Sequence, residues 1–332
     1  MAPRAPKSAD EADSLAFRAA RLVCRRHAED LHFAAVFLPP AKRDAACAVY
    51  AFCRMIREVV RSAGAGGGPR SAAEQLRHRP LAAVAANPGP SGGCCTSHPL
   101  DQCLSLIRER MDDLYARRME LPAPQGRSPE HHVLHALSLS VARFQIPPEY
   151  FLEFAEGCAT ELTVPRYATW GALERYCLRS GGSLAKLAAC VLGVTHSDAG
   201  VTAAKAGVAI RLTRILCDVK ADVAAGTVYL PLEDLANFRY TERELAAGVM
   251  TDRFRDLMRF EVERARRLYR EATDRLRWVA MGSRFAPAAV LAWYSGLLDD
   301  VERQRYDVFS RRPALTGGDR LRRLPFAWRL AR

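Results

Sequence analysis

The sequence has no long apolar run and little that favours β structure. No stretch reaches the roughly 18 consecutive apolar residues that a membrane-spanning helix needs. Residues 1–14 lack the apolar segment of a secretion signal, so we expect a soluble or peripheral protein in the cytoplasm. No segment keeps a strict alternation of apolar and polar residues, and runs of β-branched residues are scarce, which argues against sheets.

The ten cysteines also lack a recognisable metal-binding or disulfide pattern. No pair has C-x-x-C spacing, and the only adjacent pair is Cys94 and Cys95, between clusters of glycine and proline. Most of the others lie inside apolar helical segments. Small buried cysteines in a reducing compartment explain this pattern better than a disulfide framework or a zinc site.

Positive charge is in excess. The chain of 332 residues has a formal net charge of +12, while its 49% of hydrophobic and 26% of charged residues are ordinary for a globular protein. The excess favours an anionic partner, either a phosphorylated metabolite, an acidic membrane surface or a nucleic acid. We expect no nucleic-acid partner, because no binding motif is present and basic and aromatic residues do not interleave.

Apolar residues recur every three or four positions along nearly the whole chain, which predicts an all-α protein. We expect one domain over residues 15–310, preceded by a flexible N-terminus at 1–14. Thr241 and Glu244 have the spacing of a helix capping box. Glycine and proline break the pattern at 64–69 and 87–93. The predicted helices cover 15–30, 41–61, 100–118, 130–143, 148–162, 171–192, 198–223, 251–280 and 285–309.

The last residues, 311–332, form a basic tail that also contains leucine, phenylalanine and tryptophan. A segment of this composition either remains solvated or rests on an anionic membrane surface, here the inner face of the membrane.

Two apolar helices carry charge at helical spacing. In "YAFCRMIREVVRS", residues 50–62, Arg54, Arg57 and Arg61 recur at intervals of three and four among apolar residues. Taken alone, this pattern is typical of a solvated stripe on a helix surface.

The second charged helix lies in "RLTRILCDVKADVAAGTVYLPLEDL", residues 211–235. Asp218 and Asp222 are four residues apart, so both carboxylates project from the same face. A carboxylate pair on an apolar face needs a cation. Either basic side chains form salt bridges with the pair at the helix end, or the pair holds Mg²⁺, whose ligands are oxygens.

These two stretches, with "FAEGCATELTVPRYATWGALERYCLRSGGSLAKLAACVLG" between them, resemble the three ordered motifs of squalene and phytoene synthases over roughly residues 20–310. The resemblance implies an all-α, single-domain isoprenoid-synthase bundle around a central cavity. Members of the family condense two prenyl diphosphates head to head in squalene, carotenoid or hopanoid biosynthesis. The family binds the diphosphates through Mg²⁺ held by two facing aspartate-rich helices.

The chain departs from the family where the first aspartate-rich motif should stand. The family's aspartates are replaced by Arg57, Glu58 and Arg61. In the second motif, Arg211 and Arg214 replace glutamine and asparagine. The resemblance therefore leaves Mg²⁺ in doubt as a cofactor.

The resemblance assigns candidate roles to individual residues. The catalytic candidates are Asp218, Asp222 and Tyr294, and the two aspartates are also the candidate metal ligands. The candidates for binding prenyl diphosphates are His27, Tyr50, Arg54, Arg57, Arg61, Arg211, Arg214 and Tyr229.

The additional arginines leave two possibilities open. Their guanidinium groups bind a diphosphate directly in place of Mg²⁺, or Arg57 and Arg61 pair with Asp218 and Asp222 and clasp two facing helices together. We expect weak diphosphate binding with little dependence on Mg²⁺. The function expected is that of a prenyltransferase, and the alternative is an inactive protein that binds or assembles partners on the same fold. The sequence indicates no oligomeric state.

Overall fold

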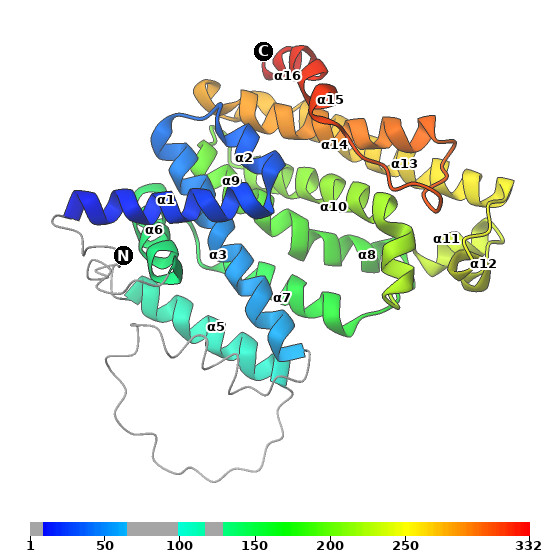
Figure 1. The fold of residues 1–332 in the computed structure, drawn as a ribbon, viewed down its shortest axis with the longest axis horizontal. Helices are drawn as coiled ribbons and strands as arrows, with labels where there is room; N and C mark the ends of the chain where they lie inside the picture. Colours follow the sequence, from blue (N-terminus) through cyan, green and yellow to red (C-terminus); the bar gives the residue numbers. More distant parts are fainter. Residues whose placement is uncertain (1–8, 65–98, 117–128) are drawn as a thin grey trace, which may run out of the picture. The chain divides into compact units, whose positions relative to one another are not determined.

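A computed structural model describes residues 9–64, 99–116 and 129–332, and in these ranges the chain is helical without any strand. The β-type backbone pairing in these ranges consists of two isolated β-bridges. The all-α prediction is therefore confirmed. The helices are α1 (Ala9–His27), α2 (Glu29–Ala35), α3 (Pro40–Gly64), α5 (Pro99–Ala116), α6 (Pro129–Phe144), α7 (Glu149–Thr163), α8 (Trp170–Cys177), α9 (Ser183–Leu192), α10 (Ala199–Ala224), α11 (Leu232–Asn237), α12 (Glu242–Ala246), α13 (Asp252–Thr273), α14 (Phe285–Arg303), α15 (Gly317–Arg322) and α16 (Leu324–Ala331), with a π-helix at Leu178–Gly182 and 3₁₀ turns at Leu276–Trp278 and Met281–Ser283 (Figure 1).

Helix ends differ from the prediction in three places. The first helix begins at Ala9, before residue 15 where we expected it to start. The helix expected over 251–280 ends at Thr273 and continues only as a 3₁₀ turn. The one expected over 285–309 ends at Arg303, because Arg305 and Tyr306 adopt left-handed backbone angles, with φ of 53° and 63°, which no α-helix accommodates.

Several sequence features lie outside the described residues. They are residues 1–8, the breaker at 64–69 beyond Gly64, the breaker at 87–93, and Cys94 with Cys95.

The described chain divides into two compact units. The first comprises the N-terminal part up to His32 and residues 40–162. In it α3 packs against α1, α5 and α6 through a face that includes Cys47 and Val60, both fully buried. Phe52 of α3 also meets Phe151 of α7 edge to face, with ring centroids 5.4 Å apart. The apolar face of α3 therefore supplies much of the core of this unit.

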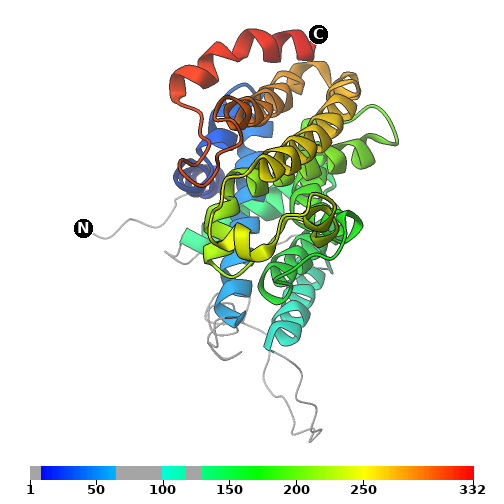
Figure 2. The same ribbon diagram turned by 90° about the vertical axis from the view of Figure 1, so that its right-hand side faces the viewer.

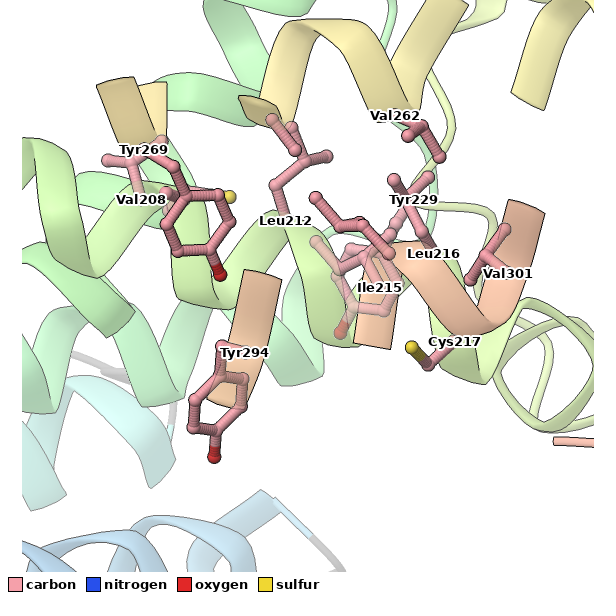
Figure 3. Close-up of a cluster of buried hydrophobic side chains, with 14 of the residues drawn as sticks. Val208, Leu212, Ile215, Leu216, Cys217, Tyr229, Val262, Tyr269, Tyr294 and Val301 are labelled. Carbon is pink, nitrogen blue, oxygen red and sulfur yellow. The ribbon is translucent and has the colours of Figure 1, made fainter. Parts of the chain in front are cut away.

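The second unit comprises residues 33–39 and 163–332. Its α10 packs against α8, α9, α13 and α14 (Figures 1 and 2). Figure 3 shows Leu212, Ile215 and Leu216 of α10 within the buried apolar cluster. Burial of these side chains removes apolar surface from water, which is the main force that holds the helices together.

The helix expected over 171–192 is interrupted by a π-helix where it meets α10. A Cβ atom on Gly207 would lie 2.2 Å from the carbonyl oxygen of Gly181, and one on Gly181 would lie 2.4 Å from the carbonyl oxygen of Gly207. The two backbones therefore touch, which only glycine permits. Single π turns of this kind are frequent at functional sites.

Threonine caps four helices of the second unit. The predicted capping box is confirmed, because Thr241 Oγ1 accepts from the amide of Glu244 at 3.2 Å and Glu244 Oε2 accepts from the amide of Thr241 at 2.8 Å. Thr169, Thr251 and Thr316 accept from backbone amides in the same way. Such a cap contributes about 1 kcal/mol to helix stability.

Residues 311–332 are folded as part of the second unit. They form α15 and α16, and α16 packs against α14 (Figure 2). The indole Nε1 of Trp293 donates to the carbonyl oxygen of Arg320 at 3.0 Å, and Arg323 pairs with Asp299. This segment is therefore not the free solvated tail that its composition allowed.

Candidate active site

One stripe of α10 carries the charged residues that the sequence singled out in the second unit. Arg211, Arg214, Asp218 and Asp222 follow one another at intervals of three and four, so they share a face of the helix. Leu212 and Ile215, which lie between them, are buried, whereas Lys220 and Ala221 are exposed. A single helix therefore both builds the core and displays two cations and two anions beside it.

Arg211 is held by tyrosine rings. Its guanidinium carbon lies 5.1 Å from the ring centroid of Tyr176 and 5.3 Å from that of Tyr229, and its Nη2 donates to the Tyr176 hydroxyl. Tyr229 stacks on both Tyr176 and Tyr167, at centroid distances of 5.4 and 5.6 Å, and the rings of Tyr167 and Tyr176 are tilted relative to each other. Cation–π contacts of this kind stabilise and orient the guanidinium without neutralising its charge.

Arg214 lies one turn further along α10, next to the candidate catalytic tyrosine. Its Nη1 donates to the hydroxyl of Tyr294 on α14 at 3.3 Å. The ring of Tyr294 is buried, while its hydroxyl points away from the apolar cluster in Figure 3. Behind it, the hydroxyls of Thr213 and Tyr269 share a hydrogen bond of 2.9 Å, and burial raises the pKa of Tyr269. The hydroxyl of Tyr294 therefore lies at the edge of an apolar environment, where it accepts a hydrogen bond from Arg214.

Asp218 is bonded to an arginine that the sequence analysis did not consider. Arg312, in the segment between α14 and α15, donates from Nε to Oδ1 at 2.5 Å and from Nη2 to Oδ2 at 3.2 Å. This hydrogen bond is the largest cause that raises the pKa of Arg312, and the nearby charge of Asp222 adds to it. The Asp218 side chain is 22% exposed and that of Arg312 is 64% exposed. The guanidinium group of Arg312 therefore binds both oxygens of Asp218, the carboxylate that we expected to bind a metal.

Asp222 and Tyr229 border a small pocket of the second unit. Its lining is otherwise mostly apolar, with Thr227 as the other polar member, so Asp222 is its one charged lining residue. The apolar lining residues are Ile215, Val219, Val223, Val228, Leu230 and Leu245.

The candidate residues of the first unit lie on α1 and α3. Tyr50 donates from its hydroxyl to the backbone carbonyl oxygen of His27 at 3.0 Å, which joins the end of α1 to α3. The His27 side chain itself is exposed. Arg54 pairs with Glu58 one turn later, with 3.1 Å between Nη2 and Oε2. Glu58, the one acidic residue left in the first motif, is therefore engaged by its own helix.

The two remaining arginines of α3 differ in their surroundings. The guanidinium carbon of Arg57 lies 5.6 Å from the ring centroid of Phe154 on α7, and Arg61 is exposed near the end of α3. Because α3 and α10 belong to different units, the expected facing of these helices and the clasp between them stay predictions.

The structure thus gathers the candidates into two groups. Arg211, Arg214, Asp218, Asp222, Tyr229 and Tyr294 lie in the second unit, and His27, Tyr50, Arg54, Arg57 and Arg61 lie in the first.

Three side chains that contact the second group, Tyr167, Tyr176 and Arg312, are not among the residues predicted from the sequence. Tyr176 and Tyr167 occur within or next to the matched middle motif, so their position was a usable signal. Arg312 gives no such signal, because it is separated from Asp218 by 94 residues.

The chain is similar to known proteins over most of its length. The 15-cis-phytoene synthase of Synechocystis is 30% identical over 325 residues, which cover 94% of this chain and 84% of that protein. The 15-cis-phytoene synthase of Synechococcus elongatus is 29% identical over 339 residues, covering 98% and 97%.

Solved structures share the fold. A dehydrosqualene synthase superimposes with a TM-score of 0.74 at 21% identity, covering 96% of each chain. A squalene synthase from Alicyclobacillus acidocaldarius gives a TM-score of 0.69 at 21% identity, covering 89% of this chain and 95% of that one. The squalene/phytoene synthase family profile matches residues 24–319. With most of its length matched, the chain belongs to the squalene/phytoene synthase family.

Proposed function

We propose that this protein is a prenyltransferase that condenses two prenyl diphosphates head to head, as the names and family of its relatives suggest. The observation that carries the proposal is the stripe on α10, where Arg211 and Arg214 are each fixed by tyrosine side chains in a chain that belongs to this family. Two relatives that are 30% and 29% identical to this chain over most of its length are phytoene synthases.

The two arginines suit the binding of a diphosphate. A guanidinium presents parallel N–H donors that match phosphate oxygens, and it keeps its positive charge at any physiological pH. The rings of Tyr176 and Tyr229 hold Arg211 in place, so less side-chain entropy is lost on binding. Arg214 in turn holds the hydroxyl of Tyr294 at the edge of the apolar cluster, where it can orient a reacting group. The buried apolar residues beside this stripe keep water from reactive intermediates.

The carboxylates of α10 suit one Mg²⁺, provided that Arg312 withdraws from Asp218. Asp218 and Asp222 lie one turn apart and would hold the ion by their oxygens. When bound, Mg²⁺ supplies charge that neutralises a leaving diphosphate. Arg312 supplies part of that positive charge from the protein itself. We therefore propose that Arg312 and Mg²⁺ compete for Asp218.

We also propose a peripheral contact between the C-terminal helices and the inner face of an anionic membrane. Phe326 and Trp328 of α16 are 46% and 50% exposed, while Ala327 between them is buried against the unit. Arg329 and Arg332 follow them, and Arg332 stacks on Trp328. An amphipathic segment with aromatic and basic residues favours the headgroup region of a membrane. Across the described residues, no helix combines the length and apolar character required to cross a membrane.

The direct test is turnover. Purified protein is incubated with farnesyl or geranylgeranyl diphosphate, with and without Mg²⁺, and both pyrophosphate release and lipid products are measured. We expect a product with twice the carbon number of the substrate, and its loss in Arg214→Ala. Binding of either diphosphate without any release of pyrophosphate would instead favour the inactive binding protein.

A further inference from the structure

Three potential metal ligands meet in the first unit, away from the α10 stripe. Cys24 lies in the last turns of α1, His32 on α2 and Cys47 on α3. A ligand atom from each of the three lies within 4.8 Å of the other two. Cys24 and Cys47 are 2% and 0% exposed, and His32 is partly exposed. The helices α1 and α3 pack directly on each other, so this meeting is built into the unit.

The spacing is close to that of a tetrahedral zinc site. Zinc binds thiolate sulfur at about 2.3 Å and imidazole nitrogen at about 2.1 Å, which places neighbouring ligand atoms about 3.5 to 4 Å apart. Small side-chain rotations would bring the three atoms from within 4.8 Å to that separation. The partly exposed imidazole leaves a way for an ion to enter.

The thiols of Cys24 and Cys47 hydrogen-bond each other, whereas one nitrogen of His32 is left unsatisfied by the described residues. Within the described part of the chain, the Nδ1 atom of His32 is buried and has no hydrogen-bond partner. A buried polar atom without a partner costs free energy, and coordination of a metal would remove that cost.

The surrounding charges are compatible with a thiolate site. Arg21, Arg25 and Arg43 lie near His32 or Cys47, and Asp44 pairs with Arg21. Metals bind the thiolate form of cysteine; Arg21 and Arg43 favour that form at Cys47, while burial and Asp44 oppose it. Two thiolates balance the charge of a divalent ion, so the arginines do not repel the complete site.

We propose that Cys24, His32 and Cys47 bind one Zn²⁺ ion through two thiolates and one imidazole, with a fourth coordination position left to water or a further ligand. Binding releases the two thiol protons and involves no change of oxidation state. Cys47 is one turn before Tyr50, which bonds the backbone of His27. The ion would thereby fasten the end of α1 to α3 where two of the candidate substrate-binding residues lie.

The test uses the full chain, reduced and stripped of metal with a chelator. Zinc uptake is measured against a chromophoric chelator, and Co²⁺ is added separately as a spectroscopic probe. We expect one equivalent of zinc at this site and a thiolate-to-cobalt charge-transfer band. Cys47→Ser should lose both, and His32→Ala should weaken zinc binding and change the cobalt spectrum. Cys103→Ser, a buried cysteine of α5 in the same unit, is the matched control and should keep both.

Helical circular dichroism of each variant separates loss of a ligand from loss of the fold. If Cys47→Ser does not fold, His32→Ala, which alters a partly exposed side chain, decides the question through the cobalt spectrum. The proposal is overturned if the reduced chain takes up no zinc, or if Cys103→Ser and the folded ligand variants bind alike. A Cys24–Cys47 disulfide in freshly isolated protein would also overturn it. None of these readouts depends on prenyltransferase activity.

Discussion

Asp218 and Arg312 form a bidentate pair in which the arginine side chain is 64% exposed. Ion pairs this open to water contribute little, typically less than about 1 kcal/mol. Water can therefore replace Asp218 as the partner of Arg312 at small cost. This makes the pair weak enough to be displaced by a divalent ion and strong enough to neutralise Asp218 when no ion is bound.

Replacement of Arg312 should therefore raise the affinity for divalent ions. In Arg312→Ala the Asp218 carboxylate loses its competing cation, and we expect tighter binding of Mn²⁺ and Mg²⁺, measured by electron paramagnetic resonance and calorimetry. The free energy of unfolding should change by no more than about 1 kcal/mol. Arg259→Ala is the control, because Arg259 is also exposed, at 62%, and pairs with Asp256. Equal metal affinity in both variants would contradict the competition.

Glu261 shows the opposite case of a carboxyl removed from water. It is fully buried, and burial raises its pKa to about 8 despite the opposing charge of Arg264. Arg264 donates to Glu261 at 2.6 Å and to the buried Asp234 at 2.8 Å. At neutral pH the Glu261 carboxyl therefore retains its proton in the folded state.

This raised pKa makes stability depend on pH. The unfolded chain releases the Glu261 proton above its ordinary pKa of 4.5, whereas the folded state keeps it up to about 8. The contribution is therefore fully present below 4.5 and is lost as pH rises to about 8. Glu261→Gln should remove this slope, so its melting temperature should fall less than that of the wild type between pH 6 and pH 9. The exposed Glu263→Gln is the control, and an equal fall in all three proteins would reject the assignment.

At the scale of helices, the contact between Gly181 and Gly207 sets how closely the π-helix and α10 approach. Tyr176 lies at the end of α8, directly before the π-helix, and accepts a hydrogen bond from Arg211 of α10. A change of one methyl group here would move two backbones, since the interfering atoms are carbonyl groups and not flexible side chains.

Gly207→Ala should therefore destabilise the protein. Alanine is a better helix former than glycine by about 1 kcal/mol, yet overpacking typically costs about 1–3 kcal/mol, and contact with a rigid backbone favours the upper end. We expect a net loss in the free energy of unfolding, measured with urea. Gly282→Ala is the control, because nothing lies within 4 Å of a Cβ added there. A stabilised Gly207→Ala would mean that the two backbones are further apart.

The C-terminal helix α16 should bind anionic vesicles through its two exposed aromatic residues. The double variant Phe326→Ser and Trp328→Ser removes the apolar part of this surface and should lower cosedimentation with vesicles that contain phosphatidylglycerol. Val201→Ser changes another exposed apolar residue, at 64% exposure on α10, and should bind as the wild type does. Neutral vesicles supply the second comparison, because the arginines require anionic lipid. Equal binding by all variants would remove α16 from the membrane contact.

At the scale of the whole molecule, two charged helix faces lie in separate units, and their joint action depends on how the units meet. Arginines of both faces serve a common diphosphate if α3 and α10 face each other. The clasp instead requires Arg57 or Arg61 to reach Asp218 or Asp222. Arg312 already engages Asp218, which favours the diphosphate role for the α3 arginines.

Arg61→Ala and Arg211→Ala should consequently both weaken the binding of pyrophosphate. A hydrogen bond to a charged group contributes about 1.5–3 kcal/mol, so each loss should lower affinity by about tenfold or more. Calorimetry measures the affinity, and Arg243→Ala, an exposed arginine on α12, should leave it unchanged. The clasp predicts a different result, in which Arg61→Ala costs stability and a double variant with Asp222→Ala costs clearly less than the sum.

Helix positions, the Thr241 capping box and the family itself follow from the sequence alone. These properties depend on neighbours along the chain, because apolar spacing and capping hydrogen bonds act over three or four residues. The shared face of Arg211, Arg214, Asp218 and Asp222 is predictable for the same reason. The family motifs likewise retain residue types at fixed spacing, which a single sequence displays.

Other properties arise from residues that only folding brings together. Arg312 reaches Asp218 from 94 residues away, and Cys24, His32 and Cys47 meet without any metal-binding spacing between them. The end of α14 and the packing of 311–332 against it likewise depended on left-handed backbone angles and on a distant partner, Trp293. Such contacts are set by the crossing of packed helices. Which side chains meet therefore depends on how the helices cross in space. The spacing of residues along the chain does not predict these contacts.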